Sequence, residues 1–570
     1  MDTDAGRGKR MANKRKIALF AAGGLFALLI LAAVALVLFV DVNAHKPRLE
    51  AAASDALGME VRIGGRLGIG LFPGFHVTLE DVRIRNRGAD VASAKETLLG
   101  IDLLPLLHKE VRVVIIGMKR PRISIEQDLD GKFNFETPEE EAGKKKDEEA
   151  QGTRFSLDVA KISLSDGALF YVDKKTGEAL EAGDFNLDVS RLRLPGGKNQ
   201  DLMKNLSFAA EFACKEFRKG SLAVSNLKLR IEGKDGRYGI RPVTADRLVY
   251  SGSGGKVTAD RLALGVENLS VGGDGKADFF RRISFSGTAG IGEVRTEDLV
   301  VSDLTSAVAG KDGVLDFDPV TMRLFGGQGS GSLRADLSGS VPHYHVRYSL
   351  SRFRIEEFLK TLSPKKAAEG SMDFSSTLSM RGKTAIEMKG TAGGEVSLRG
   401  ETLTLDGIDL DRTFSRYEAS QSFNLVDVSA FFFAGPFAPL IAKAYNFASI
   451  YRGTGGSSSI RKLVSEWKVE RGIAKAKDVA LATNEHRFAL KGSLDFVNER
   501  FHDVTVAVVD GKGCAKVRQK IRGPFGNPVV ENESVLQSVA GPMLNLFKQA
   551  RKLFGGQCEM FYAGSVAPPK

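Results

Sequence analysis

The sequence predicts a mainly β protein that carries one N-terminal transmembrane helix and a few short helices. Two observations lead to this fold class. One long uncharged apolar run stands near the N-terminus, and behind it apolar and polar residues alternate with a period of two over most of the chain. The 63 glycines fall between the alternating runs, which is typical of many short strands joined by tight turns.

The apolar run extends from Ile17 to Val40 and contains no charged side chain. At a rise of about 1.5 Å per residue, a helix of this length crosses a hydrocarbon core of about 30 Å. Basic residues Lys14 to Lys16 precede the run, and such residues hold their end in the cytoplasm, so we expect an exported body. The alternative is a cleaved signal peptide, whose apolar core would span only about 7 to 15 residues. A start at Met11 instead of Met1 predicts the same orientation.

The rest of the chain is too polar for a second span, and by composition only one charged segment divides it. The predicted regions are a cytoplasmic basic tail (1–16), the transmembrane helix (17–40), an N-terminal β region (41–136), a charged flexible loop (137–153), a central β region (154–340) and a C-terminal region (341–570), with the last boundary implied by the resemblance given below. The net charge of +11 is spread among acidic residues, without a basic stripe interleaved with aromatic residues. This distribution argues against nucleic acid as a partner.

Helices are expected at only a few places. Lys46 to Leu57 is a short helical stretch with Pro47 in its first turn. Apolar residues recur at helical spacing in Ile355 to Lys366, and further helices are predicted at Phe437 to Tyr451 and Ser534 to Phe554.

The first strands are marked by clear alternation. Apolar residues occupy every second position up to Leu79, and the phase slips before Val82, as a bulge or turn would cause. Asp130-Gly131 separates two further apolar pairs and predicts a hairpin. The predicted lining of the apolar sheet face in this region is Phe75, Val77, Leu79, Ile123, Ile125, Phe133 and Phe135.

A long sheet with one apolar face must cover that face. It packs on a second sheet, closes into a barrel, or curls so that the apolar face lines a groove, and alternation alone does not choose among these. Phe431-Phe432-Phe433 and the helix predicted after it either gate such a groove or pack in the core.

The chain has three cysteines, and two of them lie near the C-terminus. In an oxidising exported compartment, Cys514 and Cys558 are a candidate disulfide, worth about 4 kcal/mol in the chain-entropy model. The alternative is that Cys514, Cys558 and Cys214 are all buried free thiols.

Between His45 and Phe135 a series of short segments occurs in a characteristic order: Lys46–Glu50, Gly58, Val61–Gly65, Phe72-Pro73, His76–Asn86, Leu103–Leu107, Val111–Gly117, Pro121–Ile123 and Gly131–Phe135. This stretch resembles the N-terminal region of the AsmA family. The C-terminal third is also similar to the family, at Leu405–Leu410, Glu470–Ile473, Gly492–Phe496, Gly513–Ala515, Ile521–Gly523 and Cys558–Tyr562.

The resemblance implies a protein of the bacterial inner membrane whose periplasmic body is an elongated, curled antiparallel β-sheet groove. It also implies a role in outer-membrane biogenesis, with phospholipid passing along the groove towards the outer membrane. Roughly thirty strands spaced about 4.8 Å apart would extend on the order of 140 Å, so either a periplasmic or outer-membrane protein partner or an oligomer is expected to complete the path.

No catalytic chemistry is evident in the sequence. It contains no G-x-S-x-G elbow, Walker loop, HExxH or CxxC motif. His343 and His345 share one strand face but lack further ligands nearby in the sequence, which favours surface histidines over a metal site. We therefore expect no enzyme, no catalytic residue and no metal or other cofactor.

Three functional hypotheses remain from the sequence. The first is an anchored lipid conduit. The second is a scaffold or assembly factor for outer-membrane proteins that acts through exposed strand edges. The third is a plain secreted β protein with a cleaved signal, which N-terminal sequencing of the mature chain distinguishes from the other two.

Overall fold

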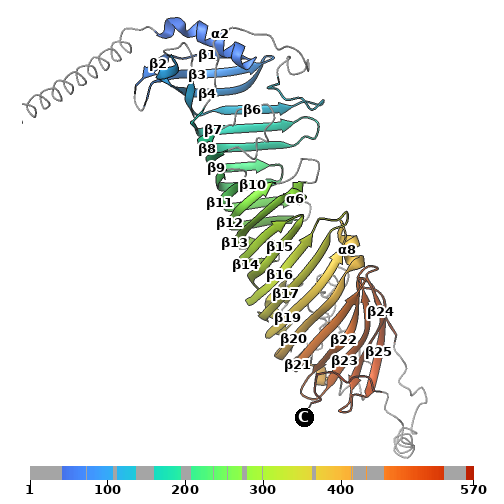
Figure 1. The fold of residues 1–570 in the computed structure, drawn as a ribbon. Coiled ribbons are helices and arrows are strands. Elements are labelled where there is room, and N and C mark those ends of the chain that lie inside the picture. The colour runs from blue at the N-terminus through green and yellow to red at the C-terminus, as the bar shows by residue number, and fades with distance from the viewer. Residues whose placement is uncertain are drawn as a thin grey trace, which may run out of the picture. The chain divides into compact units, whose positions relative to one another are not determined.

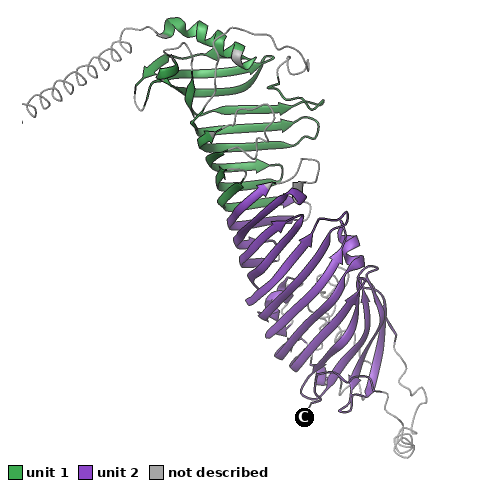
Figure 2. Ribbon diagram, in the orientation of Figure 1, with its two compact units in different colours: residues 1–250 green, residues 251–570 purple. Residues whose placement is uncertain are grey.

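The computed structural model describes residues 42–71, 74–106, 112–136, 159–193, 207–234, 237–252, 255–271, 279–297, 299–361, 368–407, 409–412, 414, 432, 455–531 and 560–569. The predicted span at 17–40, the charged loop at 137–153, and the helices predicted at 437–451 and 534–554 lie outside these residues. None of the helices that the structure describes has both the length and the apolar character needed to cross a membrane. The chain forms two compact units, residues 1–250 and 251–570 (Figure 2).

Unit 1 begins with a short helix and continues as a sheet (Figure 1). Its helical elements are η1 (Val42–His45), α2 (Lys46–Leu57) and α3 (Leu103–Leu106). Its strands are β1 (Glu60–Ile63), β2 (Leu67–Gly70), β3 (His76–Asn86), β4 (Ala89–Ile101), β5 (Val113–Lys119), β6 (Arg122–Gln127), β7 (Lys161–Asp173), β8 (Ala179–Arg193), β9 (Ser207–Lys219), β10 (Leu222–Lys234) and β11 (Arg237–Gly252). The helix predicted at Lys46–Leu57 is confirmed, and Gly58 ends it in the left-handed conformation that glycine adopts freely.

The strands of unit 1 pair mainly with their neighbours in the sequence. The slip predicted between Leu79 and Val82 is confirmed, because β2 pairs with the first part of β3 and β1 with the second, with Asp81 at positive φ between them. The expectation of a purely antiparallel sheet is wrong at β7, which pairs parallel to both β5 and β6. The long connection from β6 to β7 lets the chain return to the same end of the sheet, as a parallel pair requires.

The hairpin predicted around Asp130-Gly131 is present in outline. Gln127 and Phe133 form an antiparallel bridge, and the amide of Gly131 donates to the carbonyl of Asp128 at 3.1 Å. The second arm forms no regular strand, however. Asn134 bonds β6 through its amide, which donates to the carbonyl of Glu126 at 2.8 Å, and through its side chain, which accepts from the amide of Glu126 at 3.1 Å and donates to the carbonyl of Ser124 at 2.8 Å.

Unit 2 is a longer run of antiparallel strands. Its helices are α6 (Phe279–Arg282), α7 (Ile355–Lys360) and α8 (Ala385–Thr391). Its strands are β12 (Gly255–Val271), β13 (Ile283–Arg295), β14 (Val300–Lys311), β15 (Val314–Leu324), β16 (Gly327–Asp336), β17 (His343–Arg354), β18 (Ala368–Glu369), β19 (Ser371–Arg381), β20 (Gly393–Asp406), β21 (Ser457–Glu470), β22 (Ile473–Ala482), β23 (Arg487–Asp495), β24 (Arg500–Val509), β25 (Ala515–Pro524) and β26 (Val529–Glu531). The helix expected at Ile355–Lys366 is confirmed over its first part, as α7.

Most strands of unit 2 pair with the next strand in the chain. From β12 to β17 the pairing is sequential, β17 then pairs with β19, and the order continues from β19 to β26. The two-residue strand β18 pairs with the far end of β20. Because pairing is mainly between strands that follow one another in the chain, each strand keeps its alternating side chains in phase with its neighbours.

The C-terminal segment, residues 560–569, packs on the polar side of the strands from β21 to β24. Phe561, Tyr562 and Val566 form a small core there with alanines and valines of those strands. The Arg487 guanidinium donates to the carbonyl of Val566 at 2.9 Å, and the amide of Ser565 donates to Asp478 at 2.9 Å. The end of the described chain is therefore fixed to unit 2 by both apolar and polar contacts.

Alkaline pH is expected to release this segment. Burial raises the pKa of Tyr562, and its hydrogen bond to Asp478 adds to the effect. Because the folded pKa lies above the unfolded value of about 10, the stabilisation is complete below pH 10 and is lost as pH rises through the folded value. We expect protease cleavage within 560–569 to accelerate above about pH 10 in the native chain. The Tyr562→Phe variant should be cleaved faster than the native chain at neutral pH, and its cleavage rate should rise less steeply above pH 10. An equally steep rise would contradict the assignment of the alkaline effect to Tyr562.

Candidate functional site

Within each unit the sheet has one apolar face, defined here as the face that carries the alternate apolar side chains of its strands. In unit 2 the register keeps these residues in line from strand to strand: Val308 of β14 lies opposite Phe317, which lies opposite Leu333, which lies opposite Val346. The other face carries exposed hydroxyl and charged groups, with Thr305 bonded to Thr321 at 2.7 Å. This is the one-sided pattern that the period of two predicts.

The apolar face of unit 2 is covered unevenly along its length. On β12 to β17 most of its large side chains stay partly accessible, and Leu264 is 45% exposed. On β20 to β24 the equivalent positions are fully buried, including Leu398, Trp467 and Leu494. The accessible part, from β12 to β17, is called the open apolar face below.

The open apolar face contains a hollow of about 350 Å³. Apolar side chains from four strands line it: Ile291, Leu304, Phe317, Met322 and Val346. One inward position of β16 at the hollow is a glycine, Gly331, which lies opposite Val320 and raises no side chain from the floor. The next inward residue, Leu333, lines the hollow beside it.

Tyr348 of β17 also borders this hollow. Its hydroxyl is buried and forms no hydrogen bond in the described structure. Burial raises the pKa of Tyr348 to about 12. The hollow and this hydroxyl were missed by the sequence reasoning, although the alternating glycines in Gly327-Gln328-Gly329-Ser330-Gly331 were a signal for missing side chains on one face.

The residues predicted to line the face in unit 1 fall into two groups. Val77 and Leu79 belong to a packed cluster with Val61, Ile63 and Val82, against which Ala53 of α2 also packs. Helix α2 thus covers the apolar face at this end of the sheet. Phe75, just before β3, is half-buried.

The second group lies further along the same unit. Ile123 and Ile125 lie opposite Leu169 and Tyr171 of β7 and share their face. Phe133 shares that face through its bridge to Gln127, and Phe135 stacks on Phe133 with ring centroids 5.1 Å apart. The structure therefore brings Ile123, Ile125, Phe133 and Phe135 together and separates them from the residues beneath α2.

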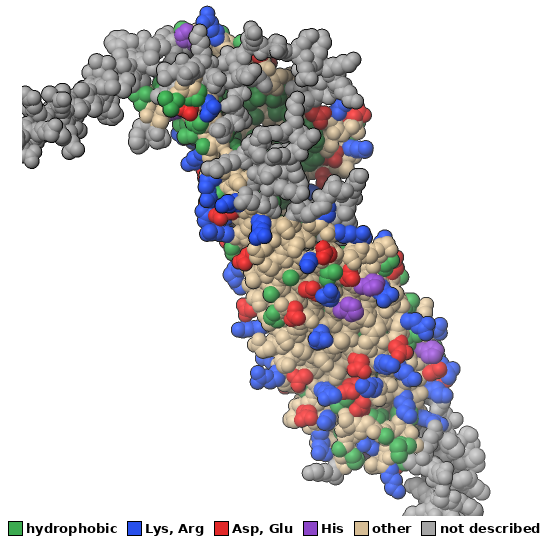
Figure 3. Space-filling model, viewed as in Figure 1, with side chains coloured by type: hydrophobic (Ala, Val, Ile, Leu, Met, Phe, Trp, Pro, Cys, Tyr) green, Lys and Arg blue, Asp and Glu red, His purple; other side chains and the backbone are tan. Residues whose placement is uncertain are grey.

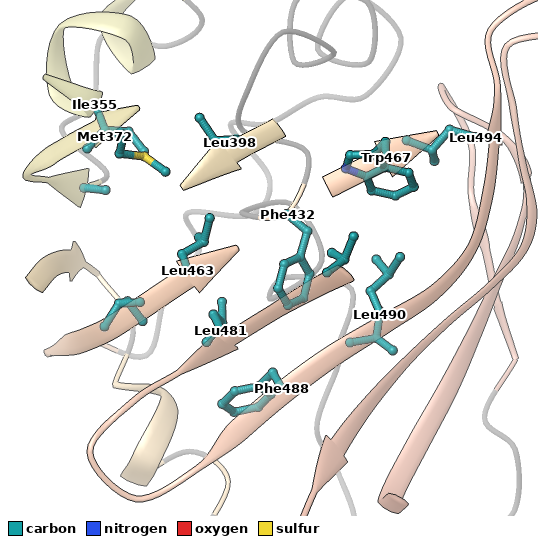
Figure 4. Packing of buried hydrophobic residues seen from close by; sticks show 14 of the residues in the cluster. Ile355, Met372, Leu398, Phe432, Leu463, Trp467, Leu481, Phe488, Leu490 and Leu494 are labelled. Atoms are coloured by element: carbon teal, nitrogen blue, oxygen red, sulfur yellow. The ribbon is translucent and has the colours of Figure 1, made fainter. Parts of the chain in front are cut away.

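The covered end of unit 2 is filled by residues of its own chain (Figure 4). Leu410, Phe414 and Phe432 are at most 1% exposed and belong to the core of β19 to β25. Ser465 of β21 donates to the carbonyl of Phe432 at 2.8 Å and accepts from the Trp467 indole at 2.7 Å. The sequence left two alternatives for Phe431–Phe433, gating of a groove or packing in the core. Phe432 packs in the core, and Phe431 and Phe433 lie outside the described residues.

One group of described residues has the geometry to hold a metal ion: Asp411, Glu485 and His486. Asp411 accepts from His486 Nδ1 at 2.9 Å and from the hydroxyl of Thr483. These hydrogen bonds connect the segment before Phe414 to the turn between β22 and β23. The cluster therefore has a structural role that requires no metal ion. His343 and His345 lie on the polar face, away from this cluster in sequence and register.

Charged side chains of both signs are interspersed on the visible face of unit 2 (Figure 3). Exposed cross-strand pairs include Arg334 with Asp316 at 3.0 Å and Lys477 with Glu395 at 3.4 Å. Such exposed pairs contribute at most about 1 kcal/mol each, so they mainly keep this face soluble.

The cysteines differ in state. Cys514 is disulfide-bonded, whereas Cys214 of β9 is a buried free thiol. Burial raises the pKa of the Cys214 thiol, which keeps it protonated and unreactive at neutral pH. Cys558 lies outside the described residues, so its pairing with Cys514 stays a prediction.

These features define a class: mainly β proteins whose long sheets keep one apolar face, open in part and covered in part by segments of the same chain. The AsmA family model matches residues 11–253 and 280–436, more than half of the chain, and the chain belongs to the AsmA family. The match includes Leu405–Leu410 but ends before the other C-terminal segments whose resemblance was noted above, and their similarity stays a prediction. Neither the curated proteins nor the solved structures contain a match.

Proposed function

We propose that this protein carries phospholipid on the apolar faces of its sheets during outer-membrane biogenesis. The observation that carries the proposal is the open apolar face of unit 2 with its hollow of about 350 Å³. An acyl chain placed there would gain about 0.8 kcal/mol for each methylene removed from water. Membership of the AsmA family supports the same role, because the family is associated with the outer membrane.

The anchor belongs to this proposal. Residues 17–40 would span the inner membrane of a bacterium, with the tail in the cytoplasm and the body in the periplasm. Among the described elements, η1 and then α2 follow this segment, and α2 covers the apolar face at the N-terminal end of unit 1. Lipid would then reach the sheet beyond α2, where Ile123, Ile125 and Phe133 share a face with β7.

The alternative of a scaffold that acts through strand edges has less support. The first edge of unit 1 is already occupied, because side chains that precede β1 accept hydrogen bonds from its outward amides. The amide of Val61 donates to Ser54 at 2.9 Å, and that of Ile63 donates to Glu50 at 2.7 Å. An edge capped in this way is protected from pairing with another chain.

A matched pair of substitutions on β12 tests the lipid proposal. Leu264 lies on the open apolar face opposite Ala289, and Ala263, its neighbour, is exposed on the polar face. Because Leu264 is 45% exposed, Leu264→Asp places no buried charge in the lipid-free protein. A bound acyl chain would bury that charge without a partner, which costs several kcal/mol.

The full chain would be extracted in detergent, and its lipids would be quantified by mass spectrometry. We expect Leu264→Asp to retain several-fold less phospholipid than the native chain and to weaken the outer-membrane barrier. Ala263→Asp should match the native chain in both measurements. Equal lipid content in the two variants, at equal protein level, would overturn the proposal.

A further inference from the structure

Two exposed leucines lie at one end of the sheet of unit 1. Leu71 directly follows β2 and is 41% exposed, and Leu104 lies in α3, just after β4, and is 73% exposed. Strand β3 lies between β2 and β4, because its first residue, His76, pairs with Gly70 on one side and with Gly100 on the other. Neighbouring strands are about 4.8 Å apart, so β2 and β4 lie roughly 10 Å apart, and both leucines follow the same end of these strands.

The chain before β1 runs back towards this same end. Strands β1 and β2 follow one another along β3, and α2 passes beside them in the opposite direction. Four hydrogen bonds trace its path, in which Ser54 accepts from the amide of Val61, Glu50 accepts from the amide of Ile63, Lys46 donates to the carbonyl of Gly65, and Asn43 of η1 accepts from the amide of Leu67. Each step towards the N-terminus is thus a step towards the end of β2 (Figure 1).

The described chain therefore begins beside the end of the sheet that carries the two leucines. Only Asp41 stands between Val42 and the apolar run that ends at Val40. Two residue steps span at most about 7 Å. If residues 17–40 span the membrane, as proposed above, the bilayer surface lies next to η1, and Asn43 of η1 is bonded to β2 at Leu67, a few residues before Leu71.

Single exposed leucines are ordinary on soluble surfaces and need no explanation by themselves. The position of this pair is what gives it a meaning, because the anchor brings a hydrocarbon phase to the end of the sheet where both side chains are accessible. An exposed leucine that enters lipid leaves water, and this transfer is favourable. The occupant of this surface is therefore a phospholipid bilayer.

The charged groups at this end limit the depth of insertion. Asp102 accepts from the amide of Leu104 at 3.2 Å, and its own amide donates to the carbonyl of Arg112 at 3.0 Å. A carboxylate and a guanidinium thus lie at the base of α3. Because ionised groups are costly in hydrocarbon, we expect Asp102 and Arg112 to stay at the level of the headgroups while the leucines enter the acyl region.

We propose that this end of unit 1, called the membrane edge and defined by Leu71 and Leu104, inserts shallowly into the leaflet that faces the body of the protein. This inference rests on the proposed function, because it requires residues 17–40 to span the membrane. It adds a direction to that function. The strand ends would meet the lipid, so an acyl chain leaving the leaflet would reach the apolar face of unit 1 without crossing water.

The test places a fluorescent probe on a cysteine at the membrane edge of the full chain, in the variant Leu104→Cys. The chain would be reconstituted in vesicles of phosphatidylethanolamine and phosphatidylglycerol that include a lipid with a nitroxide on its acyl chain, close to the ester. Nitroxides quench only nearby probes, so we expect strong quenching at Leu104→Cys and at Leu71→Cys. The native chain, treated in the same way, gives the background from its own cysteines.

Leu129→Cys is the matched control. Leu129 belongs to the same unit and is 68% exposed, but it follows β6, which runs antiparallel to β4 and pairs through Ile123 with Ala92, near the start of β4. It therefore lies at the opposite end of the sheet from Leu104. An apolar probe that sought the membrane by itself would be quenched equally at both positions, whereas we expect several-fold stronger quenching at Leu104.

The outcomes separate this inference from the proposed function. Quenching at Leu129 that equals or exceeds that at Leu104 overturns the membrane edge, and so does the absence of quenching at both positions in a chain that stays in the vesicles. In either case the lipid content of the native chain still decides the proposed function. A chain that separates from the vesicles on flotation contradicts the anchor, and the inference then fails together with that part of the proposed function.

Discussion

Replacing Phe432 with alanine is expected to destabilise unit 2 by about 3–5 kcal/mol, the usual range for removing a fully buried phenyl group. Phe432 is 1% exposed and fills the core between β21 and β23 (Figure 4). Its main-chain carbonyl is held by Ser465, which is bonded to Trp467 in turn. A cavity at this position would therefore loosen the segment that covers the apolar face at this end.

Trp467 makes this prediction simple to measure, because it is the sole tryptophan of the chain and is 1% exposed in the same core. Its fluorescence in a denaturant titration should report a lower midpoint for Phe432→Ala. Phe135→Ala removes the same group from a residue that is 41% exposed, and it should leave the tryptophan transition unchanged. An unchanged midpoint for Phe432→Ala would show that Phe432 does not pack as described.

The strands were predictable from the sequence because alternation and pairing obey one physical rule. Once one face is buried, a slip of one residue would expose every apolar side chain, so alternation fixes the phase of each strand. The slip between Leu79 and Val82 was visible for this reason. The parallel pairing of β7 was not, because it depends on the path of the connection after Phe135 and leaves alternation unchanged.

The elements that cover the apolar face could not be predicted from the sequence either. Leu79 and Ile125 have the same alternation, yet Leu79 lies in a packed cluster with Val61 while Ile125 lies beside Tyr171 further along. The difference comes from α2, whose position is a tertiary property. Likewise, glycine was interpreted in the sequence as a signal for turns between strands, whereas Gly331 lies inside β16 and lines the hollow that the proposed function uses.

The second large effect is expected at the other end of the chain. Leu79→Asp should destabilise the cluster beneath α2 by about 3–5 kcal/mol, because Leu79 is 9% exposed and a carboxylate there has no partner. The consequence would be local release of α2 and β1. Hydrogen exchange should accelerate at Val61 and Ile63, whose amides donate to Ser54 and Glu50 of the helix.

Arg83→Asp on the same strand is the matched control, since Arg83 is exposed on the opposite face and lies across from Arg62. It should leave exchange at β1 unchanged, and full protection of β1 in Leu79→Asp would contradict the packing of α2 on this cluster.

The comparison also decides how transport variants are interpreted. A charge at Leu79 would abolish transport by disrupting the fold, so its failure says nothing about lipid. A charge at Leu264 alters an accessible side chain, and only that kind of variant separates loss of a lipid surface from loss of structure.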